Sequence, residues 1–266
     1  MRHCAITFEK NTVTKSAAPD LMRVEVEKTR RAHEIGKDCG LFRAPRVLDY
    51  DDAKGMAVFE RIHGLVGIRP YIAFGDPDYR IIDNLANALR VIHREMKLPA
   101  ELVIPLPSEY RATNEVFLHG DLSVDNVCTV EGTLPLVIID WNTTPLHGGR
   151  ATYGTRYFDL AWFLHNLFNR PSYKVLFSDP ITPVARRFVD VYAEGAGDCF
   201  QDVEFALYLK HFFEVELPLV GSQVYWKIKA FLPRSHFLLR RFMRSLAAES
   251  SRKSRGQSEY SGRGKE

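Results

Sequence analysis

The interpretation of this chain rests on the segment His119-Gly120-Asp121-Leu122-Ser123-Val124-Asp125-Asn126 and on the segment Val137-Ile138-Ile139-Asp140-Trp141 that follows it. Together they place an aspartate, an asparagine and a second aspartate on two neighbouring loops, each beside a hydrophobic stretch. Mg²⁺ prefers oxygen ligands, and enzymes usually hold it by one or two carboxylates together with substrate phosphates. This arrangement is therefore typical of Mg²⁺-assisted phosphoryl transfer, in which a further carboxylate accepts or orients the proton of the acceptor hydroxyl.

The spacing within these segments suggests how the side chains meet. Asp121 and Asn126 are five positions apart, too far for one extended strand to aim both at one ion, so we expect a short loop that folds back. Asp140 ends the apolar run 136–139, and a carboxylate at the exit of a buried strand can present a metal ligand to a cleft. The ordinary alternatives are an aspartate at Asp121 that caps a turn and a turn asparagine at Asn126.

Composition sets the broad class of protein. The chain has 266 residues, of which 45% are hydrophobic and 26% charged, as expected for a globular enzyme with a core, in one large domain or two small lobes. Its net charge of +3 is too small to argue for nucleic-acid binding. Its cysteines lie far apart and form no C-x-x-C pair, so neither a zinc site nor a disulfide framework is indicated. Met1–Thr7 lacks the apolar run of a signal peptide, and no apolar stretch approaches the roughly 20 residues needed to span a bilayer. We therefore expect a cytoplasmic protein with reduced thiols.

The first third of the chain predicts a small sheet and one helix. The β-rich runs are His3–Glu9, Thr12–Ala17, Pro45–Tyr50 and Met56–Glu60, the first two joined by a tight turn at Lys10-Asn11. Between the second and third runs, Asp20 is a candidate N-cap for a helix that reaches about Ile35 and that Gly36 would end.

The remainder of the chain is predicted to be mainly helical. Apolar residues recur at helical spacing from about Asp78 to Lys97. Further helices are expected at 158–168, 183–194, 203–215 and 222–246. The last stretch, 249–266, is rich in Ser, Arg, Lys and Gly and is expected to be a disordered basic tail.

Four segments occur in the order found in a known family: 85–93, 119–126, 138–141 and 157–161. On these motifs the chain resembles the aminoglycoside phosphotransferase and choline kinase group of small-molecule kinases, within the protein-kinase-like fold. The resemblance covers about residues 12–192 and is strongest from 85 to 163. It implies an α+β, two-lobed fold with an antiparallel-sheet N-lobe carrying one helix (1–62), a larger, mainly helical C-lobe (63–248) and the tail (249–266).

The resemblance also implies roles for individual residues. Asp121 is the expected catalytic residue, and Asn126 and Asp140 are the expected ligands of Mg²⁺. His119 and Asp159 are expected to support the site structurally; an N-cap for the following helix is compatible with that role of Asp159. Trp141 stands where protein kinases have Phe-Gly, which favours a small-molecule kinase.

In the N-terminal third, the family's lysine that binds the α and β phosphates is matched to Lys15, and the alternative is an exposed lysine on an edge strand. A glutamate on the next helix should hold this lysine. At about 100° per residue, Glu25 falls near the apolar face of Leu21 and Val24 whereas Glu27 falls opposite, so Glu25 is preferred.

The adenine base is expected at the connection between the lobes, read by the backbone of Glu60 and Ile62; the alternative is a plain exit from a strand into a loop. One departure from the family pattern concerns the glycine-rich loop that covers the phosphates, because no residue from Met1 to Thr14 is glycine. Either the turn Lys10-Asn11 covers the phosphates in a reduced form, or the family's first strand is missing and nucleotide affinity is weakened or depends on a partner.

The expected reaction moves the γ-phosphoryl group of ATP or GTP, bound with Mg²⁺, to a hydroxyl of a small molecule such as an aminoglycoside, amino alcohol, sugar or glycolipid. The acceptor pocket should come from the helices after Asp159. The alternative is a catalytically silent pseudokinase that serves as a binding scaffold. The basic tail is expected to be solvated; contact with anionic lipid or nucleic acid is the less favoured interpretation.

Overall fold

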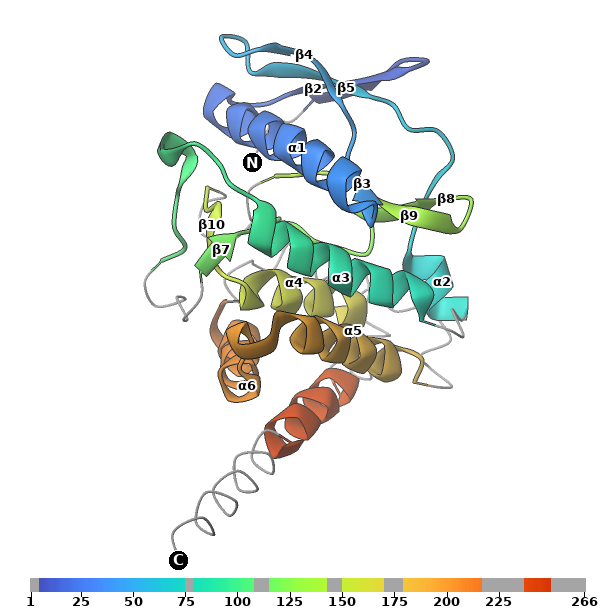
Figure 1. The fold of residues 1–266 in the computed structure, drawn as a ribbon, viewed down its shortest axis with the longest axis vertical. Coiled ribbons are helices and arrows are strands. Elements are labelled where there is room, and N and C mark those ends of the chain that lie inside the picture. The colour runs from blue at the N-terminus through green and yellow to red at the C-terminus, as the bar shows by residue number, and fades with distance from the viewer. Residues whose placement is uncertain are drawn as a thin grey trace, which may run out of the picture.

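The computed structural model describes residues 5–74, 79–107, 115–142, 150–169, 179–216 and 237–249. Figure 1 shows the strands of the first sheet at one end of the molecule, α1 beneath them and the remaining helices stacked toward the other end. The expected tail beyond residue 249 and most of the helix expected at 222–246 lie outside the described residues. Within the described part, no helix combines the length and apolar character needed to cross a membrane.

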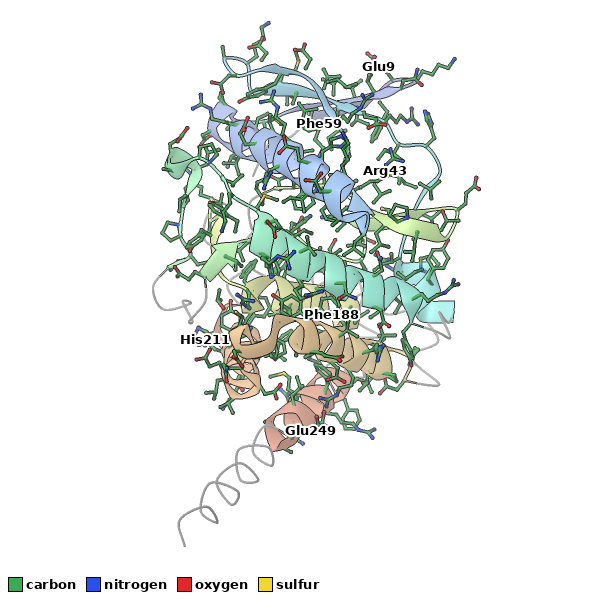
Figure 2. All side chains as sticks on the ribbon, viewed as in Figure 1. Glu9, Arg43, Phe59, Phe188, His211 and Glu249 are labelled. Atoms are coloured by element: carbon green, nitrogen blue, oxygen red, sulfur yellow. The ribbon has the colours of Figure 1, made fainter. Side chains whose placement is uncertain are left out.

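The first sheet has the strand order β1-β2-β5-β4, and all of its neighbouring strands are antiparallel. Its strands are β1 (Ala5–Phe8), β2 (Thr12–Ser16), β4 (Val47–Asp51) and β5 (Met56–Glu60). Helix α1 (Pro19–Cys39) packs on this sheet through a small core formed by Met22, Val26, Ala57 and Phe59, the last of which is labelled in Figure 2.

Helix α1 differs at both ends from the sequence prediction. Its N-cap is Ala18, which has no side chain able to cap, and Asp20 lies inside the first turn. The helix runs through Gly36 to Cys39 and ends at Gly40, whose φ of 68° is the left-handed conformation that glycine adopts easily. Gly36 serves packing instead: a Cβ atom there would lie 2.5 Å from the carbonyl oxygen of Phe42.

The second sheet carries the loops on which the sequence predicts site residues. It has the order β3-β9-β8-β6, and a separate pair joins β7 to β10. The strands are β3 (Phe42–Arg43), β6 (Leu65–Gly67), β7 (Glu115–Phe117), β8 (Val127–Val130), β9 (Thr133–Ile138) and β10 (Tyr153–Thr155). Val127 pairs with Ile138 across β8 and β9, so the loop before β8 and the loop after β9 lie side by side.

The helices pack in layers below this sheet around one large core that includes Phe188 (Figures 1 and 2). They are α2 (Arg69–Phe74), α3 (Arg80–Glu95), α4 (Tyr157–Asn169), α5 (Ile181–Ala196), α6 (Asp202–His211), a π-helical turn (Phe212–Glu216) and a final helix at 237–249. Short 3-10 turns lie at Ala100–Leu102 and Gly197–Cys199. Glu249, where the sequence predicts the start of the tail, is helical and pairs with Arg186 at 2.8 Å.

Candidate active site

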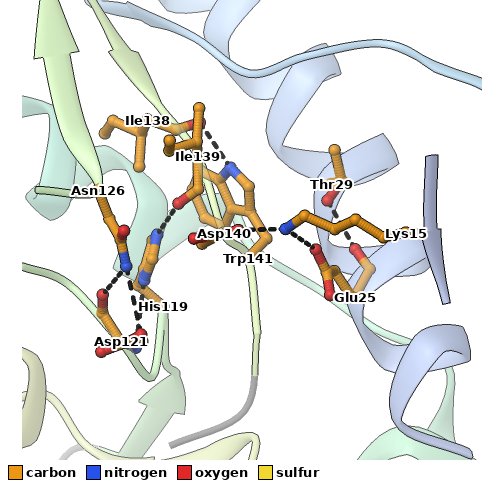
Figure 3. Close-up of polar contacts among 10 residues, drawn as sticks. All are labelled: Lys15, Glu25, Thr29, His119, Asp121, Asn126, Ile138, Ile139, Asp140 and Trp141. Atoms are coloured by element: carbon orange, nitrogen blue, oxygen red, sulfur yellow. Dashed lines mark hydrogen bonds and ion pairs between the residues drawn. The ribbon is translucent and has the colours of Figure 1, made fainter. Parts of the chain in front are cut away.

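Lys15 on β2 forms ion pairs with carboxylates from two other segments of the chain. Its ammonium group lies 2.7 Å from Oε1 of Glu25 on α1, and it also forms an ion pair with Oδ1 of Asp140, which follows β9. Figure 3 shows the lysine reaching across from β2 between the two carboxylates. Burial by itself lowers the pKa of Lys15, but the charges of Glu25 and Asp140 and their hydrogen bonds outweigh burial and raise it. Lys15 is therefore a fixed positive charge at neutral pH.

The two glutamates on α1 lie as the helical wheel indicates. Glu25 is buried and contacts Lys15. Glu27 is on the outer side and pairs with Arg30 at 2.7 Å. Thr29 donates its hydroxyl to the carbonyl oxygen of Glu25 at 2.6 Å, which fixes this turn of the helix below the lysine.

The loop before β8 folds back so that Asn126 contacts Asp121. The side-chain amide of Asn126 donates to the carbonyl oxygen of Asp121 at 2.8 Å and to its Oδ2 atom at 3.3 Å. Ser123 stabilises the turn, because its Oγ accepts the N–H of Asn126 at 3.2 Å. Since the nitrogen of Asn126 is engaged in this way, its side-chain oxygen is the atom suited to a metal ion.

Asp140 is held beside Asn126 by the backbone. The N–H of Ile139 donates to the carbonyl oxygen of Asn126 at 3.0 Å, so the next residue, Asp140, leaves the sheet next to the turn (Figure 3). Asp140 has a φ of 55°, a left-handed conformation that aspartate tolerates better than most residues. Trp141 then turns back into the core and donates its indole N–H to the carbonyl oxygen of Ile138 at 2.9 Å.

Asn126 and Asp140 offer only oxygen ligands. Among the described residues there is no group of three or more His, Cys, Asp and Glu side chains that could hold a metal ion. A complete protein cage is therefore absent from that part of the chain. One carboxylate and one amide oxygen fit Mg²⁺, a hard cation that proteins commonly bind through only one or two carboxylates of their own.

His119 links the two loops in a neutral form. It is fully buried; its Nδ1 accepts the N–H of Asp121 at 3.3 Å, and its Nε2 lies 3.2 Å from the carbonyl oxygen of Ile139. An accepting Nδ1 and a donating Nε2–H describe one tautomer of the uncharged ring. Burial, and then the charge of Lys28, lower its pKa to about 4, so His119 stays neutral under ordinary conditions.

Asp159 holds the backbone just before Asp121. It is fully buried at the start of α4 and accepts the N–H groups of His119 and Gly120 at 2.7 and 2.9 Å. His93 on α3 supplies a third contact from Nε2 at 3.0 Å, and Tyr192 lies 2.7 Å from the other ring nitrogen of His93. Burial alone raises the pKa of Asp159, but these hydrogen bonds and the histidines outweigh it and lower the pKa. Asp159 therefore remains an acceptor for the loop.

A cleft of about 420 Å³ adjoins Lys15, Glu25 and Asp140, and its walls include Glu60 and Ile62. The N–H of Glu60 already donates to the carbonyl oxygen of Arg46 at 2.9 Å. The Glu60 carboxylate is held 3.5 Å from the guanidinium of Arg43. Glu60 and Ile62 thus line the same cleft as Lys15.

The turn Lys10-Asn11 lies beside Glu60 and Arg61, and not beside Lys15 and Asp140, where the sequence analysis considered it as a cover for the phosphates. Thr12 pairs with Glu60 in the sheet, and the N–H of Arg61 donates to the carbonyl oxygen of Asn11 at 2.9 Å. The antiparallel register therefore places the turn at the connection between the lobes. The opposite end of the hairpin adjoins the lysine, because Ile6 pairs with Lys15.

Trp162 and Lys28 are among the side chains at the site that were not predicted from the sequence. Trp162 on α4 donates its indole N–H to Oδ1 of Asp121 at 2.8 Å. Lys28 on α1 is fully buried and donates to the carbonyl oxygens of His119, at 2.6 Å, and of Asn142. The sequence could have indicated that Lys28 is buried, since it falls within the apolar stripe of α1. The contact between Trp162 and Asp121 joins residues 41 positions apart, and no local sequence pattern indicates it.

Comparisons with known proteins agree with this architecture. Residues 97–198 match the model of the phosphotransferase enzyme family, whereas no curated protein sequence matches the chain. A choline/ethanolamine kinase family protein from Mesorhizobium loti is similar in structure, with a TM-score of 0.52 and 14% identity over 92% of this chain and 90% of that chain. An aminoglycoside 2'-phosphotransferase-IIIa solved with GDP gives 0.51 and 13% over 91% and 89%. A macrolide 2'-phosphotransferase from Brachybacterium faecium gives 0.50 and 12% over 90% and 86%. The predicted resemblance and the two-lobed, protein-kinase-like α+β fold are thus confirmed.

Proposed function

We propose that this chain, which resembles the aminoglycoside phosphotransferase and choline kinase group, moves the γ-phosphoryl group of a nucleoside triphosphate to a hydroxyl of a small molecule. The observation that carries the proposal is the position of Lys15 between Glu25 and Asp140 at the cleft. A lysine held by a helical glutamate beside a metal-binding aspartate is the arrangement that phosphoryl transfer uses. The assembled ion pairs argue against the silent scaffold.

In this proposal each side chain has one task. Lys15, held by Glu25, binds the α and β phosphates of the nucleotide. Asn126 and Asp140 hold Mg²⁺, which when bound neutralises charge on the phosphates. Asp121, whose carboxylate is fixed by Asn126 and by Trp162, accepts or orients the proton of the acceptor hydroxyl. His119 and Asp159 keep the loop in this shape.

The base of the nucleotide would occupy the end of the cleft at Glu60 and Ile62. Because the N–H of Glu60 is engaged by Arg46, we assign the base to the carbonyl group of Glu60 and to the backbone of Ile62. We place the lobe boundary at about residue 62, since Glu60 ends the first sheet and Leu65 begins a strand of the second. Either ATP or GTP suits backbone recognition of this kind, and the similar aminoglycoside phosphotransferase was solved with GDP.

The acceptor would approach Asp121 from the side of α4, where Trp162 contacts its carboxylate. The acceptor classes under this proposal are aminoglycosides, amino alcohols, sugars and glycolipids. We also propose a cytoplasmic setting, because Cys39, Cys128 and Cys199 are free thiols.

The test is a screen for release of ADP or GDP from the Mg²⁺ nucleotide over a panel of such hydroxylated compounds. With an acceptor in hand, Asp121→Ala should abolish the release, and Asp38→Ala at the exposed end of α1 should retain it. Nucleotide binding without turnover of any hydroxyl compound would favour the scaffold and contradict the proposal.

A further inference from the structure

Lys28 is a buried cation whose contacts are not explained by the roles assigned above. It lies three residues after Glu25 on α1 and is fully buried. Its ammonium group donates to the carbonyl oxygen of His119 at 2.6 Å and to that of Asn142. Both partners are backbone atoms, one on each of the two loops that form the candidate site.

These two carbonyl groups lie close in sequence to the expected catalytic residue and to one expected metal ligand. His119 precedes Asp121 by two positions, and Asn142 follows Asp140 by two positions. One side chain from α1 therefore bridges the loop of the expected catalytic aspartate and the loop of the expected metal ligand. Since residues three apart share one face of a helix, α1 contacts Lys15 through Glu25 and both loops through Lys28.

A space-filling role does not account for a lysine at this position. Burial of an ammonium group is unfavourable unless hydrogen bonds and opposite charges compensate for it. An unbranched apolar side chain such as methionine would fill similar space without that cost. The charges of Asp159, Glu25 and Asp121 act on Lys28 and offset part of it. The cation thus sits where three carboxylates of the site favour it.

We propose that Lys28 is a positioning residue that fixes the two loops relative to α1, so that the nucleotide-binding and catalytic groups are assembled by one helix. It touches neither nucleotide nor acceptor; it acts through the backbone of His119 and Asn142. The inference rests on the proposed phosphotransferase function. Without Lys28, the lysine–glutamate pair and nucleotide binding persist, while the loops lose their fixed distance from the phosphates.

If Lys28 positions the loops, its loss should reduce turnover much more than nucleotide binding. Misplacement of a catalytic group by about 1 Å can lower a rate about a hundredfold. Lys28→Met should therefore lower kcat at least tenfold, while the dissociation constant for the Mg²⁺ nucleotide changes less than threefold. A merely structural role would reduce the fraction of folded protein, but it would not change turnover per nucleotide-binding site.

The experiment compares wild type, Lys28→Met and the matched control Lys37→Met, which alters an exposed lysine in the last turn of α1. Titration with Mg²⁺-ATP and Mg²⁺-GTP counts the binding sites and gives the dissociation constants. Hydrolysis of the same nucleotides without acceptor then gives kcat per site, so no acceptor needs to be known. Lys37→Met should match wild type in both measurements.

The outcomes separate the two proposals. Wild-type hydrolysis that Lys28→Met leaves within twofold would overturn the role of Lys28 and leave the proposed function intact. A wild type that neither binds nor hydrolyses the nucleotides would overturn both. If Lys28→Met does not fold, Lys28→Gln takes its place. Its shorter side chain keeps an N–H donor for one carbonyl, and the expected loss of kcat is at least threefold; an unchanged kcat would again overturn the role.

Discussion

Trp162 donates its indole N–H to Oδ1 of Asp121, with 2.8 Å between the nitrogen and the oxygen. The other carboxylate oxygen lies 3.3 Å from the amide nitrogen of Asn126. Each oxygen of the expected catalytic carboxylate thus has a donor from a different element, which fixes the plane of the carboxylate. The aromatic side chain also packs in the helical core, parallel to Phe158.

Trp162→Phe should keep the packing and remove only the donor. A hydrogen bond to a charged group contributes about 1.5–3 kcal/mol, so we expect kcat to fall roughly tenfold to a hundredfold with little change in nucleotide affinity. Steady-state kinetics with an identified acceptor measure this effect. The control is Tyr157→Phe, which deletes a hydroxyl at the start of the same helix, bonded to Gln201. Equal kcat in Trp162→Phe and wild type would show that the contact is dispensable.

The choice of glutamate on α1 can be tested directly. Glu25→Gln removes the charge that holds Lys15 at 2.7 Å, and we expect kcat/KM for the nucleotide to fall at least tenfold, or about 1.4 kcal/mol. Glu27→Gln, which removes the charge of the exposed pair with Arg30, should change it less than twofold. A larger effect at Glu27 than at Glu25 would reverse the assignment.

Lys28 should contribute to the pH dependence of the free energy of unfolding. Burial lowers its pKa from 10.5 to about 8, although Asp159, Glu25 and Asp121 partly oppose the shift. His119, which also faces it, is neutral in this range. Between about pH 8 and 10.5 the unfolded chain binds more protons at this site than the native protein, so this group raises the free energy of unfolding as pH rises.

Urea unfolding of wild type and Lys28→Met at several pH values from 7 to 10 measures this contribution. The unfolding free energy of wild type minus that of the variant should increase across the range, with most of the increase above pH 8. A difference that stays constant with pH would mean that the pKa of Lys28 is not lowered in the folded protein.

Replacing Gly36 by alanine should destabilise the protein, whereas the same replacement in an ordinary helix stabilises it. In an ordinary helix interior, Gly→Ala stabilises by about 1 kcal/mol. Here the added Cβ would lie 2.5 Å from the backbone oxygen of Phe42, and overpacking of this kind costs about 1–3 kcal/mol. Gly36→Ala should therefore lower the urea midpoint. A raised midpoint would show that β3 moves away from α1 without cost.

Much of the fold is predictable because local patterns and tertiary structure agree. The β-rich runs at β2 and β5, the apolar face of α3 and the order of the motifs led to the same architecture that the structure has. The end of α1 was predicted wrongly at Gly36 because a glycine inside a helix and a glycine after its end look alike in sequence. Only the position of Phe42 distinguishes them.

The site is predictable where one short segment carries its residues, as with Asp121 and Asn126. The contact of Trp162 depends on how α4 packs, which no local pattern encodes. Lys28 is an intermediate case. It interrupts the apolar stripe of Leu21, Val24, Ala32 and Ile35 at helical spacing, and a lysine in such a stripe indicates a buried partner. Likewise, the position of the Lys10-Asn11 turn follows from strand register, which the sequence left open.

We infer that Asn126 and Asp140 together hold a divalent cation beside Asp121. A crystal structure with Mn²⁺ and a non-hydrolysable ATP or GTP analogue tests it most directly, because the anomalous signal of manganese locates the ion. We expect an ion bound to the side-chain oxygens of Asn126 and Asp140 and to the phosphates, with Lys15 moved from Asp140 to the phosphates and still paired with Glu25. An ion bound elsewhere, or a nucleotide bound in the cleft while Asn126 and Asp140 both lack contact with the ion, would contradict it.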